Sequence, residues 1–469
     1  MEGLEISIVK KSEAFEPFFN ARFDPEFFQK YYTDIYKNIL CKDHEFLGEF
    51  AFITDGEHGN AVTSEIGYSK YYGARNVLSG ILSDNNVEYI SEQHHKKLRK
   101  SALAPRDVLI SCVGANIGYA AIVPDDIGIA NIVRNVALIR SNSCEFANEY
   151  LHAYFCSSYG KNLYIRMNTG NAQPLVSLDY IKTLPVYKPS IDFQNKIKNL
   201  VNFSLNALRK SKNTYVSAEM VLLNTLGMGD FSPSADAINV KSFKDSFAAT
   251  GRLDAEYYQP KYEDYEQTVI NHSAGFTTIA AEFDLVKETS QREKSAYNYI
   301  EISDVSIGDG AANFNRLDIG ELPANAKKEV RRGDLLISKV RPNRGAVAII
   351  DFDDTDLIVS GAFTVLRART DSIFSNETLK VLLRTPMYRD WMLKFNIGTQ
   401  YPVIRDEDIL NLPIPFIDEK TQEKVATLVK ESFSLKLESE RLLQFAKRAV
   451  EIAIEQNENT GMAYIKANS

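Results

Sequence analysis

The sequence predicts an α+β protein made of two similar domains with mixed or antiparallel β cores, joined by two long helices that pair as an antiparallel coiled coil. Three observations predict this fold: an internal duplication about half the chain long, short apolar runs bounded by turn residues in each copy, and a long amphipathic segment at the end of each copy. Each copy therefore consists of a strand-rich part followed by a long helix.

The duplication is clearest where each copy runs into its long helix. Residues 170–194 return 228 positions later as residues 398–422, and the glycine, the proline, the Leu-Pro pair and the final glutamine all return at matching places. Residues 22–29 return as 252–259, and 106–111 return as 333–338. Because the offset hardly changes, the copies share one scaffold. Between these landmarks the copies differ almost completely, as expected of one scaffold that carries two different surfaces.

Strands are expected where short apolar or alternating runs are bounded by Gly, Pro, Asn or Asp. These runs are 108–111, 119–123, 136–139, 299–302, 335–338 and 346–350. Apolar residues at helical spacing predict helices near 149–164 and 376–395. The paired aromatics Phe27-Phe28 and Tyr257-Tyr258 are expected in the cores, and Gly170 and Gly398 are expected to form turns with positive φ.

The two long helices are expected from about Ile191 to Leu226 and from about Glu419 to Gln456, where apolar residues recur at threes and fours. Asp192 and Asp418 are the expected N-caps. Two helices with one apolar stripe each most simply pair with each other. About 35 residues at roughly 1.5 Å each give a rod of about 50 Å, which spans about 15 base pairs of B-DNA.

Composition is that of an ordinary soluble protein, with 469 residues, 44% hydrophobic and 25% charged. No targeting segment and no uncharged stretch of membrane-spanning length is present, so a cytoplasmic location with no membrane contact is expected. The four cysteines, at 41, 112, 144 and 156, show no Cys-x-x-Cys spacing, so they are expected to be reduced and mostly buried, without a zinc site or disulfides.

The net charge of −8 argues against a protein coated in basic residues, but two basic clusters stand at similar points of the two copies. A charge run is often only a solvated surface, yet its repetition favours a role in binding phosphates. The cluster residues are His94, His95, Lys96, Lys97, Arg99, Lys100 and Arg106 in the first copy, and Lys327, Lys328, Arg331, Arg332, Lys339, Arg341 and Arg344 in the second.

Four motifs occur along the chain in an order that is typical of one family. They are the turn at 54–58, the Arg-x-Asp-x-Glu-Tyr-Tyr run at 252–258, the Gly333-Asp334-Leu335-Leu336-Ile337-Ser338 strand with Gly345, and the Leu-Pro-Ile-Pro run at 412–415. Together with the duplication, they resemble the specificity subunit of type I restriction-modification systems over essentially the whole chain. The first copy departs from this pattern with Arg106 where the second has Gly333.

The resemblance implies target-recognition domains at 1–187 and 230–416, a central spacer helix at 188–229 and a C-terminal spacer helix and tail at 417–469. It also implies double-stranded DNA as the ligand and, as partners, two modification (methyltransferase) subunits and restriction (motor-nuclease) subunits. The chain itself is expected to be non-catalytic and to need no cofactor or metal, since it has no phosphate-loop or methyltransferase motif and no repeated cluster of catalytic residues.

Phosphate contacts are expected from eight cluster residues: Lys96, Lys97, Arg99, Lys100, Lys327, Lys328, Arg331 and Arg332. Base contacts are expected from polar turns at 54–60, 75–76, 171–173, 341–344 and 400–401. Apart from the cluster residues, the DNA-contacting candidates are Thr54, His58, Asn60, Arg75, Gln173, Gln400 and Tyr401.

Two alternatives stay open at this point. One is a recognition subunit of a related phage-defence methylation system, with no nuclease. The other is a coiled-coil adaptor that binds proteins and no DNA, which the acidic balance favours and the basic clusters disfavour.

Overall fold

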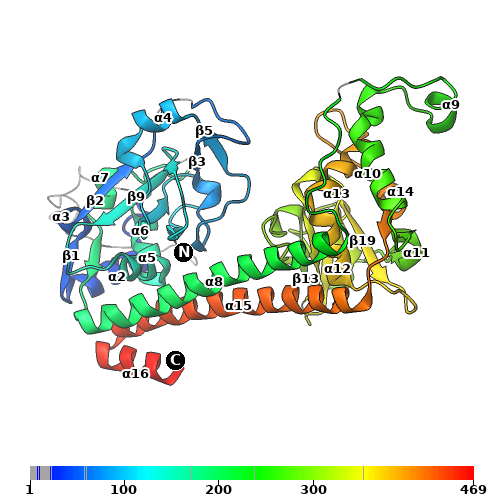
Figure 1. Cartoon of the computed structure of the whole chain (residues 1–469). Coiled ribbons are helices and arrows are strands. Elements are labelled where there is room, and N and C mark those ends of the chain that lie inside the picture. The colour runs from blue at the N-terminus through cyan, green and yellow to red at the C-terminus, as the bar shows by residue number, and fades with distance from the viewer. Residues whose placement is uncertain are drawn as a thin grey trace. The chain divides into compact units, whose positions relative to one another are not determined.

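The computed structural model describes residues 8, 10, 22, 24–57, 59, 61–170, 172–236, 238–351 and 353–468 (Figure 1). The chain divides into two compact units. Unit 1 comprises residues 1–208 and 436–469, and unit 2 comprises residues 209–435. The N-terminal segment up to residue 21 lies outside the described residues except for Ile8 and Lys10. His58, Asn60 and Asn171 also lie outside them.

Unit 1 contains a mixed sheet in the order β2-β9-β6-β7-β4, a smaller sheet in the order β5-β3-β8 and the pair β1-β10. Its strands are β1 (His44–Phe46), β2 (Ala51–Asp55), β3 (Ser69–Tyr72), β4 (Gly80–Ile81), β5 (Glu88–Ile90), β6 (Val108–Ser111), β7 (Ala120–Ile122), β8 (Ala130–Ile132), β9 (Val136–Ser141) and β10 (Pro185–Tyr187). Its helices are α2 (Lys30–Leu40), α3 (Leu47–Phe50), α4 (Glu92–Lys97), α5 (Asn148–Cys156), α6 (Ser158–Arg166), α7 (Leu178–Lys182) and α16 (Glu458–Asn468), with short turns η1 (Ala74–Asn76) and η2 (Arg99–Ser101).

Unit 2 repeats this plan with a sheet in the order β12-β19-β16-β17, a second in the order β14-β13-β18-β15 and the pair β11-β20. Its strands are β11 (Phe276–Thr278), β12 (Phe283–Leu285), β13 (Ala296–Ile300), β14 (Asn315–Asp318), β15 (Ala326–Glu329), β16 (Leu335–Ser338), β17 (Val347–Ile349), β18 (Leu357–Ser360), β19 (Phe363–Ala368) and β20 (Pro413–Pro415). Its helices are α9 (Phe247–Thr250), α10 (Pro260–Ile270), α11 (Ile279–Glu282), α12 (Asn376–Arg384), α13 (Pro386–Trp391) and α14 (Asp406–Leu410), with turns η3 (Ala255–Tyr258), η4 (Ile302–Asp304), η5 (Pro342–Arg344) and η6 (Met392–Phe395).

The expected strands are present, and their sheets are mixed. Strands β6 and β16 match the expected ranges because every residue in them is buried, which leaves a continuous apolar run in the sequence. Most pairs are antiparallel, but β3-β8, β4-β7 and β13-β18 are parallel. The strand expected at 299–302 ends at Ile300, because the Asp304 carboxylate accepts a hydrogen bond from the Glu301 N–H at 2.9 Å and closes the turn η4.

Each of the two expected shorter helices is divided in two by a capping residue. Ser157 ends α5 and its hydroxyl accepts from the Gly160 N–H, while Thr385 ends α12 and its hydroxyl accepts from the Tyr388 N–H. These residues stand 228 positions apart, so the break belongs to the duplicated scaffold. In the sequence the apolar spacing continues across the break, because both halves face the same core.

The long helices are α8 (Ile191–Thr225) and α15 (Glu419–Glu455), in agreement with the expected ranges. In unit 1, Ser204 of α8 donates to the Ser439 carbonyl at 2.8 Å; in unit 2, Ser211 donates to the Ser432 carbonyl at 2.7 Å. Since the partner number falls as the α8 number rises, the helices run antiparallel. Asp418 caps α15 as expected, but Asp192 lies inside the first turn of α8 and Ser190 is the cap.

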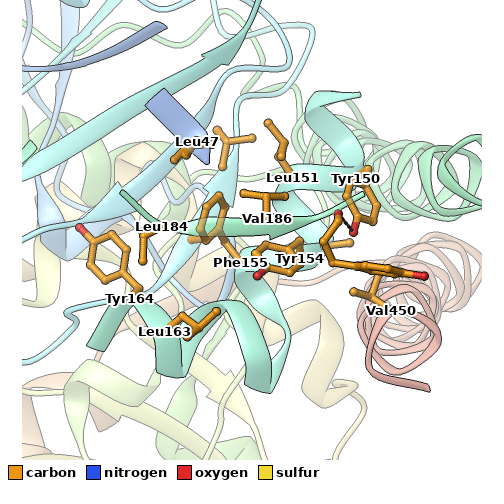
Figure 2. Packing of buried hydrophobic residues seen from close by; sticks show 14 of the residues in the cluster. Leu47, Tyr150, Leu151, Tyr154, Phe155, Leu163, Tyr164, Leu184, Val186 and Val450 are labelled. Atoms are coloured by element: carbon orange, nitrogen blue, oxygen red, sulfur yellow. Dashed lines mark hydrogen bonds between the residues drawn. The ribbon is translucent and has the colours of Figure 1, made fainter. Parts of the chain in front are cut away.

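The core of unit 1 lies where α5 packs between a strand and the long helices (Figure 2). The rings of Tyr150 and Tyr154 are fully buried, and their hydroxyls donate to the Tyr187 and Pro185 carbonyls at 2.7 Å. Val186 and Val450 pack in the same cluster. Phe27 and Phe28 also belong to this core, as expected, whereas Tyr257 and Tyr258 are half-buried.

Two polar anchors are built once in each unit at equivalent positions. The buried carboxylate of Asp107 accepts from Arg140 at 2.6 Å, and that of Asp334 accepts from Arg367 at 2.8 Å. The side chains of Gln194 and Gln422 tie the start of each long helix to the loop before α5 or α12. These bonds explain why the Asp and Gln landmarks repeat in the sequence.

The cysteines are free, as expected, but Cys41 and Cys144 are exposed. Among the described residues, no helix is long and apolar enough to cross a membrane.

Candidate nucleic-acid interface

The first basic cluster lies on α4 and η2, along strand β8. The Ser91 hydroxyl caps α4, His94 pairs with Glu57 at 2.5 Å, and His95 hydrogen-bonds to Asn131 of β8. These bonds fix one side of the helix to unit 1. The side chains of Lys96, Lys97, Arg99 and Lys100 are exposed.

In the second basic cluster, Lys327 and Lys328 lie on strand β15, which pairs with β18. The other cluster residues lie beyond β15: Arg331 and Arg332 before β16, and Lys339, Arg341 and Arg344 after it. Strand β18 is the counterpart of β8, because each is the parallel partner of the equivalent strands β13 and β3. Lys96 and Lys97 on helix α4 and Lys327 and Lys328 on strand β15 therefore lie beside equivalent strands, although in different secondary structure. That the two clusters contact phosphates stays a prediction.

Carboxylates already pair with part of this positive charge. Besides the pairs of Lys328 and Lys339 described below, the Lys and Arg candidates form these ion pairs: Arg75 with Glu88 (2.6 Å), Lys96 with Glu92 (2.7 Å), Arg106 with Asp125 (2.7 Å), and Arg332 with Asp351 (3.0 Å) and Asp353 (2.5 Å). Within the described part of the chain, no carboxylate lies in ion-pair distance of Lys97, Arg99, Lys100, Lys327, Arg331 or Arg341. A phosphate would break no ion pair with a described carboxylate at these six side chains.

Lys328 and Lys339 are engaged within unit 2. The Lys328 ammonium donates to the Phe363 carbonyl at 2.9 Å and lies 4.0 Å from Asp406, and the Lys339 ammonium lies 3.2 Å from Asp406. Burial lowers the pKa of Lys328, and Asp406 opposes that shift. The Thr364 hydroxyl completes the network with a 2.5 Å bond to Asp406. Both lysines are therefore held by the half-buried Asp406 and are less available to DNA than the exposed cations.

In unit 2, the loop around Arg341 contacts the loop around Pro402, which is distant in sequence. The Arg341 N–H donates to the Pro402 carbonyl at 2.7 Å, and Val340 and Val403 form an isolated β-bridge. The exposed guanidinium of Arg341 lies 5.6 Å from the centre of the Tyr401 ring, which is 44% exposed. Of the other candidates, Arg344 and Gln400 are exposed on the same two loops.

The same two loops meet in unit 1 with different side chains. The Gly114 N–H donates to the Pro174 carbonyl at 3.1 Å, and Val113 bridges to Leu175. Gly114 takes the place of Arg341, and the exposed Gln173 takes the place of Tyr401. We will call these structures the tip loops: residues 112–118 with 168–176 in unit 1, and residues 339–345 with 396–404 in unit 2.

One asparagine in each unit closes the second tip loop. The Asn168 side chain accepts from the N–H groups of Gly170 and Leu175, and the Asn396 side chain accepts from those of Gly398 and Val403. The prediction of positive φ at Gly170 and Gly398 is wrong, since neither is among the glycines with positive φ. Glycine is needed at both positions because another part of the backbone lies too close for a side chain. A β-carbon would lie 1.8 Å from the Gln173 carbonyl oxygen at Gly170 and 2.1 Å from the Tyr401 carbonyl oxygen at Gly398.

Sequence reasoning missed Asn116 on the first tip loop of unit 1. Its side-chain amide donates to the Ala74 carbonyl at 3.4 Å and so joins this loop to the turn that carries Arg75. The signal was the spacing Asn116-x-Gly118, which returns as Asn343-x-Gly345 in the second copy. Thr54 lies half-buried on β2, and its hydroxyl donates to the Asp55 carbonyl.

In the part of the chain that the structure describes, no group of three His, Cys, Asp or Glu could hold a metal ion. A hollow of about 720 Å³ in unit 1 is lined by residues near the start of α8, including Lys42, Glu145 and Lys188. Neither this hollow nor a second one of about 350 Å³ near the start of α15 contains a candidate residue.

One curated protein matches a part of this chain in sequence. A segment of 114 residues, 24% of this chain, is 26% identical to the "Type I restriction enzyme HindI specificity subunit" of Haemophilus influenzae. This chain resembles type I specificity subunits. The match covers 25% of the relative, so less than two thirds of the relative's length is spanned. No family model matches the chain.

Solved structures of type I proteins align with most of the chain. The HsdS subunit from Thermoanaerobacter tengcongensis aligns over 88% of this chain and 97% of its own, with 15% identity and a TM-score of 0.29. The type I S subunit from M. genitalium aligns over 90% and 95%, with 9% identity and a TM-score of 0.35. A structure concerned with assembly of the type I R-M system aligns over 89% and 97%, with 16% identity and a TM-score of 0.29. At such TM-scores these likenesses carry no argument.

Proposed function

We propose that this chain is the DNA specificity subunit of a type I restriction-modification complex and reads a target in two parts, one with each unit. The observation that carries this proposal is the pair of tip loops. Both units hold them on the same backbone, with the closing asparagine and the proline kept, and present different side chains at the tip. Two equivalent loop structures that present different exposed polar side chains could each read a different half of a DNA target.

Phosphate contacts are proposed for the exposed cations that have no carboxylate partner. They are Lys97, Arg99 and Lys100 in unit 1, and Lys327 and Arg331 in unit 2. Base contacts are proposed for Gln173, Asn116 and Arg75 in unit 1, and for the Arg341, Arg344, Gln400 and Tyr401 side chains in unit 2. The local positive charge on α4 and β15 makes DNA binding compatible with a net charge of −8.

The partners proposed are two methyltransferase subunits and, for restriction, motor-nuclease subunits, with catalysis confined to them. The name of the Haemophilus relative supports this assignment, because it describes a specificity subunit of a restriction enzyme. Residues 1–187 and 230–416 are proposed as the two target-recognition domains, with 188–229 and 417–469 as spacer helices. A non-DNA adaptor is the competing function, and the acidic balance favours it.

Matched arginine variants test DNA binding. We expect Arg331→Ala in the full chain, bound to its modification subunits, to weaken binding to all duplexes alike and to lower the slope of log K against log salt by about 0.9 for each lost phosphate contact. Arg332→Ala should change the slope less, since Asp351 and Asp353 already pair with Arg332. Fluorescence anisotropy on a duplex series at several salt concentrations measures both.

Two results would count against the proposal in different ways. Equal slopes for the two variants and the unsubstituted chain would remove Arg331 from the phosphate contacts. No binding of the unsubstituted complex to any duplex, despite stable assembly, would favour the adaptor.

A further inference from the structure

Arg341, at the tip of unit 2, stands in a backbone conformation that favours glycine. Its φ is 49° and its ψ is 55°, where the β-carbon of an L-residue crowds the following carbonyl oxygen. The equivalent residue of unit 1 is Gly114, with φ 90°. A side chain has therefore been placed on a turn that a glycine forms without strain.

Arg106 shows how such an arginine can be explained by structure alone. It has a φ of 70° and replaces Gly333 of the other unit, but its guanidinium makes an ion pair with Asp125 at 2.7 Å. Arg341 has no such partner: no described carboxylate pairs with it, and its side chain is exposed. The ring of Tyr401 is the contact that the structure gives its guanidinium. Backbone strain that no ion pair within the protein offsets is typical of residues with a functional role.

The residue that faces this position also changes between the units. Where unit 2 has Arg341 beside Tyr401, unit 1 has Gly114 beside Gln173, and the Gln173 amide nitrogen lies 3.9 Å from where a β-carbon on Gly114 would stand. The two positions that touch at the tip thus differ together, whereas the residues that frame them are kept. This is the pattern expected if the two residues that differ between the units set DNA specificity, while the loop residues common to both units only support them.

We propose that Arg341, supported by the Tyr401 ring, reads a guanine in the half of the DNA target that unit 2 binds. This inference rests on the proposed function. A guanidinium presents two parallel N–H groups that match the O6 and N7 acceptors of guanine in the major groove, the commonest specific arginine contact. Contact with an aromatic ring holds the planar guanidinium while its edge stays free to donate.

The test compares methylation motifs in cells that express the modification subunit with the full chain or its variants. Arg341→Gly leaves a residue that unit 1 carries at the same turn, so the fold is kept. We expect one guanine of one half-site to become degenerate, with selectivity at that position reduced about 10- to 100-fold, while the other half-site is unchanged. Arg341→Lys keeps the positive charge but loses the two parallel N–H groups. It should therefore lose the same selectivity while the overall affinity for DNA is kept.

Arg369→Ala is the matched control, because Arg369 is an exposed arginine of the same unit that pairs with Asp284 and is no candidate for DNA contact, and it should leave the motif unchanged. An unchanged motif in both Arg341 variants, or loss of selectivity at a position that is not guanine, would overturn the inference and leave the proposed function standing. Uniformly weaker methylation of all sites in Arg341→Gly, with Arg341→Lys normal, would make Arg341 a phosphate contact and also overturn it. An unsubstituted complex that methylates no motif would remove the proposed function and the inference together.

Discussion

His152 of unit 1 is a buried histidine at the position where unit 2 has the buried Lys380. Its Nε2 pairs with the Gly80 carbonyl at 3.0 Å, which holds the β4 region against α5. Burial, and then the positive charge of Lys447, lowers the pKa of His152 from 6.5 to about 3. The imidazole is therefore neutral in the folded chain near pH 7.

This buried histidine predicts a loss of stability in mild acid. Between about pH 6.5 and pH 3 the unfolded chain binds a proton at His152 and the folded chain does not, so stability falls as the pH drops below about 6.5. At about 1.4 kcal/mol per pH unit, unit 1 should lose about 2 kcal/mol between pH 7 and pH 5 through this group. Hydrogen exchange of the β6 amides at both pH values measures the change.

His152→Gln should lack this part of the pH dependence. Unit 2 is an internal control, because the chain's one tryptophan, Trp391, is buried there and reports its unfolding by fluorescence. The same acid loss in the variant and in the unsubstituted chain would contradict the role given to His152.

Close approach at the tip loops predicts a sharp difference between two glycines of unit 2. Gly398→Ala places a β-carbon 2.1 Å from the Tyr401 carbonyl oxygen and should lower the free energy of unfolding by about 1–3 kcal/mol. A β-carbon on Gly320 would meet nothing within 4 Å, so Gly320→Ala should stay within about 0.5 kcal/mol. Urea unfolding followed by Trp391 fluorescence compares the two, and equal effects would show that the tip loop is not tightly closed.

At the scale of elements, the start of α8 depends on Ser190. Its hydroxyl accepts from the Phe193 N–H at 3.3 Å and donates to Glu458 of α16 at 2.6 Å. Ser190→Ala should cost unit 1 about 1–2 kcal/mol, whereas Asp192→Ala, inside the first turn, should cost a few tenths. Hydrogen exchange of the first turns of α8 distinguishes them. A larger loss for Asp192→Ala would restore Asp192 as the cap.

The serine contacts between α8 and α15 show how the duplication shapes an element. Ser204 and Ser211 recur 228 positions later as Ser432 and Ser439, and the antiparallel pairing joins Ser204 to Ser439 and Ser211 to Ser432. Each bonded pair thus contains one residue of each copy. Small buried hydroxyls that bond across the helices fix their register, which an apolar stripe alone leaves open.

At the scale of the whole molecule, the sequence predicted what is built twice. The strands β6 and β16, both long helices and the positions of the anchoring Asp107, Asp334, Gln194 and Gln422 all lie at repeated landmarks, because one scaffold imposes the same burial on both copies. The match to the Haemophilus specificity subunit supports the family that these landmarks indicated.

What the sequence could not predict lies where tertiary contacts decide. The basic residues 94–100 became a helix because His94 and His95 bond to Glu57 and Asn131, and residues 326–329 became a strand because β18 offers an edge. The meeting of Arg341 with Tyr401 joins loops 60 residues apart. Arg106 and Arg332 pair with carboxylates about 20 positions away, whereas the pair of Lys96 with Glu92 lies within α4 and follows from helical spacing. The spacing of residues along the sequence does not indicate contacts between such distant segments.

The most direct test of the central claim is the methylation motif of DNA from cells that express the modification subunit with and without this chain, read by single-molecule sequencing. We predict an asymmetric motif of two short parts separated by unread base pairs, present when this chain is expressed and absent without it. A motif that is unchanged without this chain, or no motif despite a stable complex, would contradict the claim that the two units read DNA for their partners.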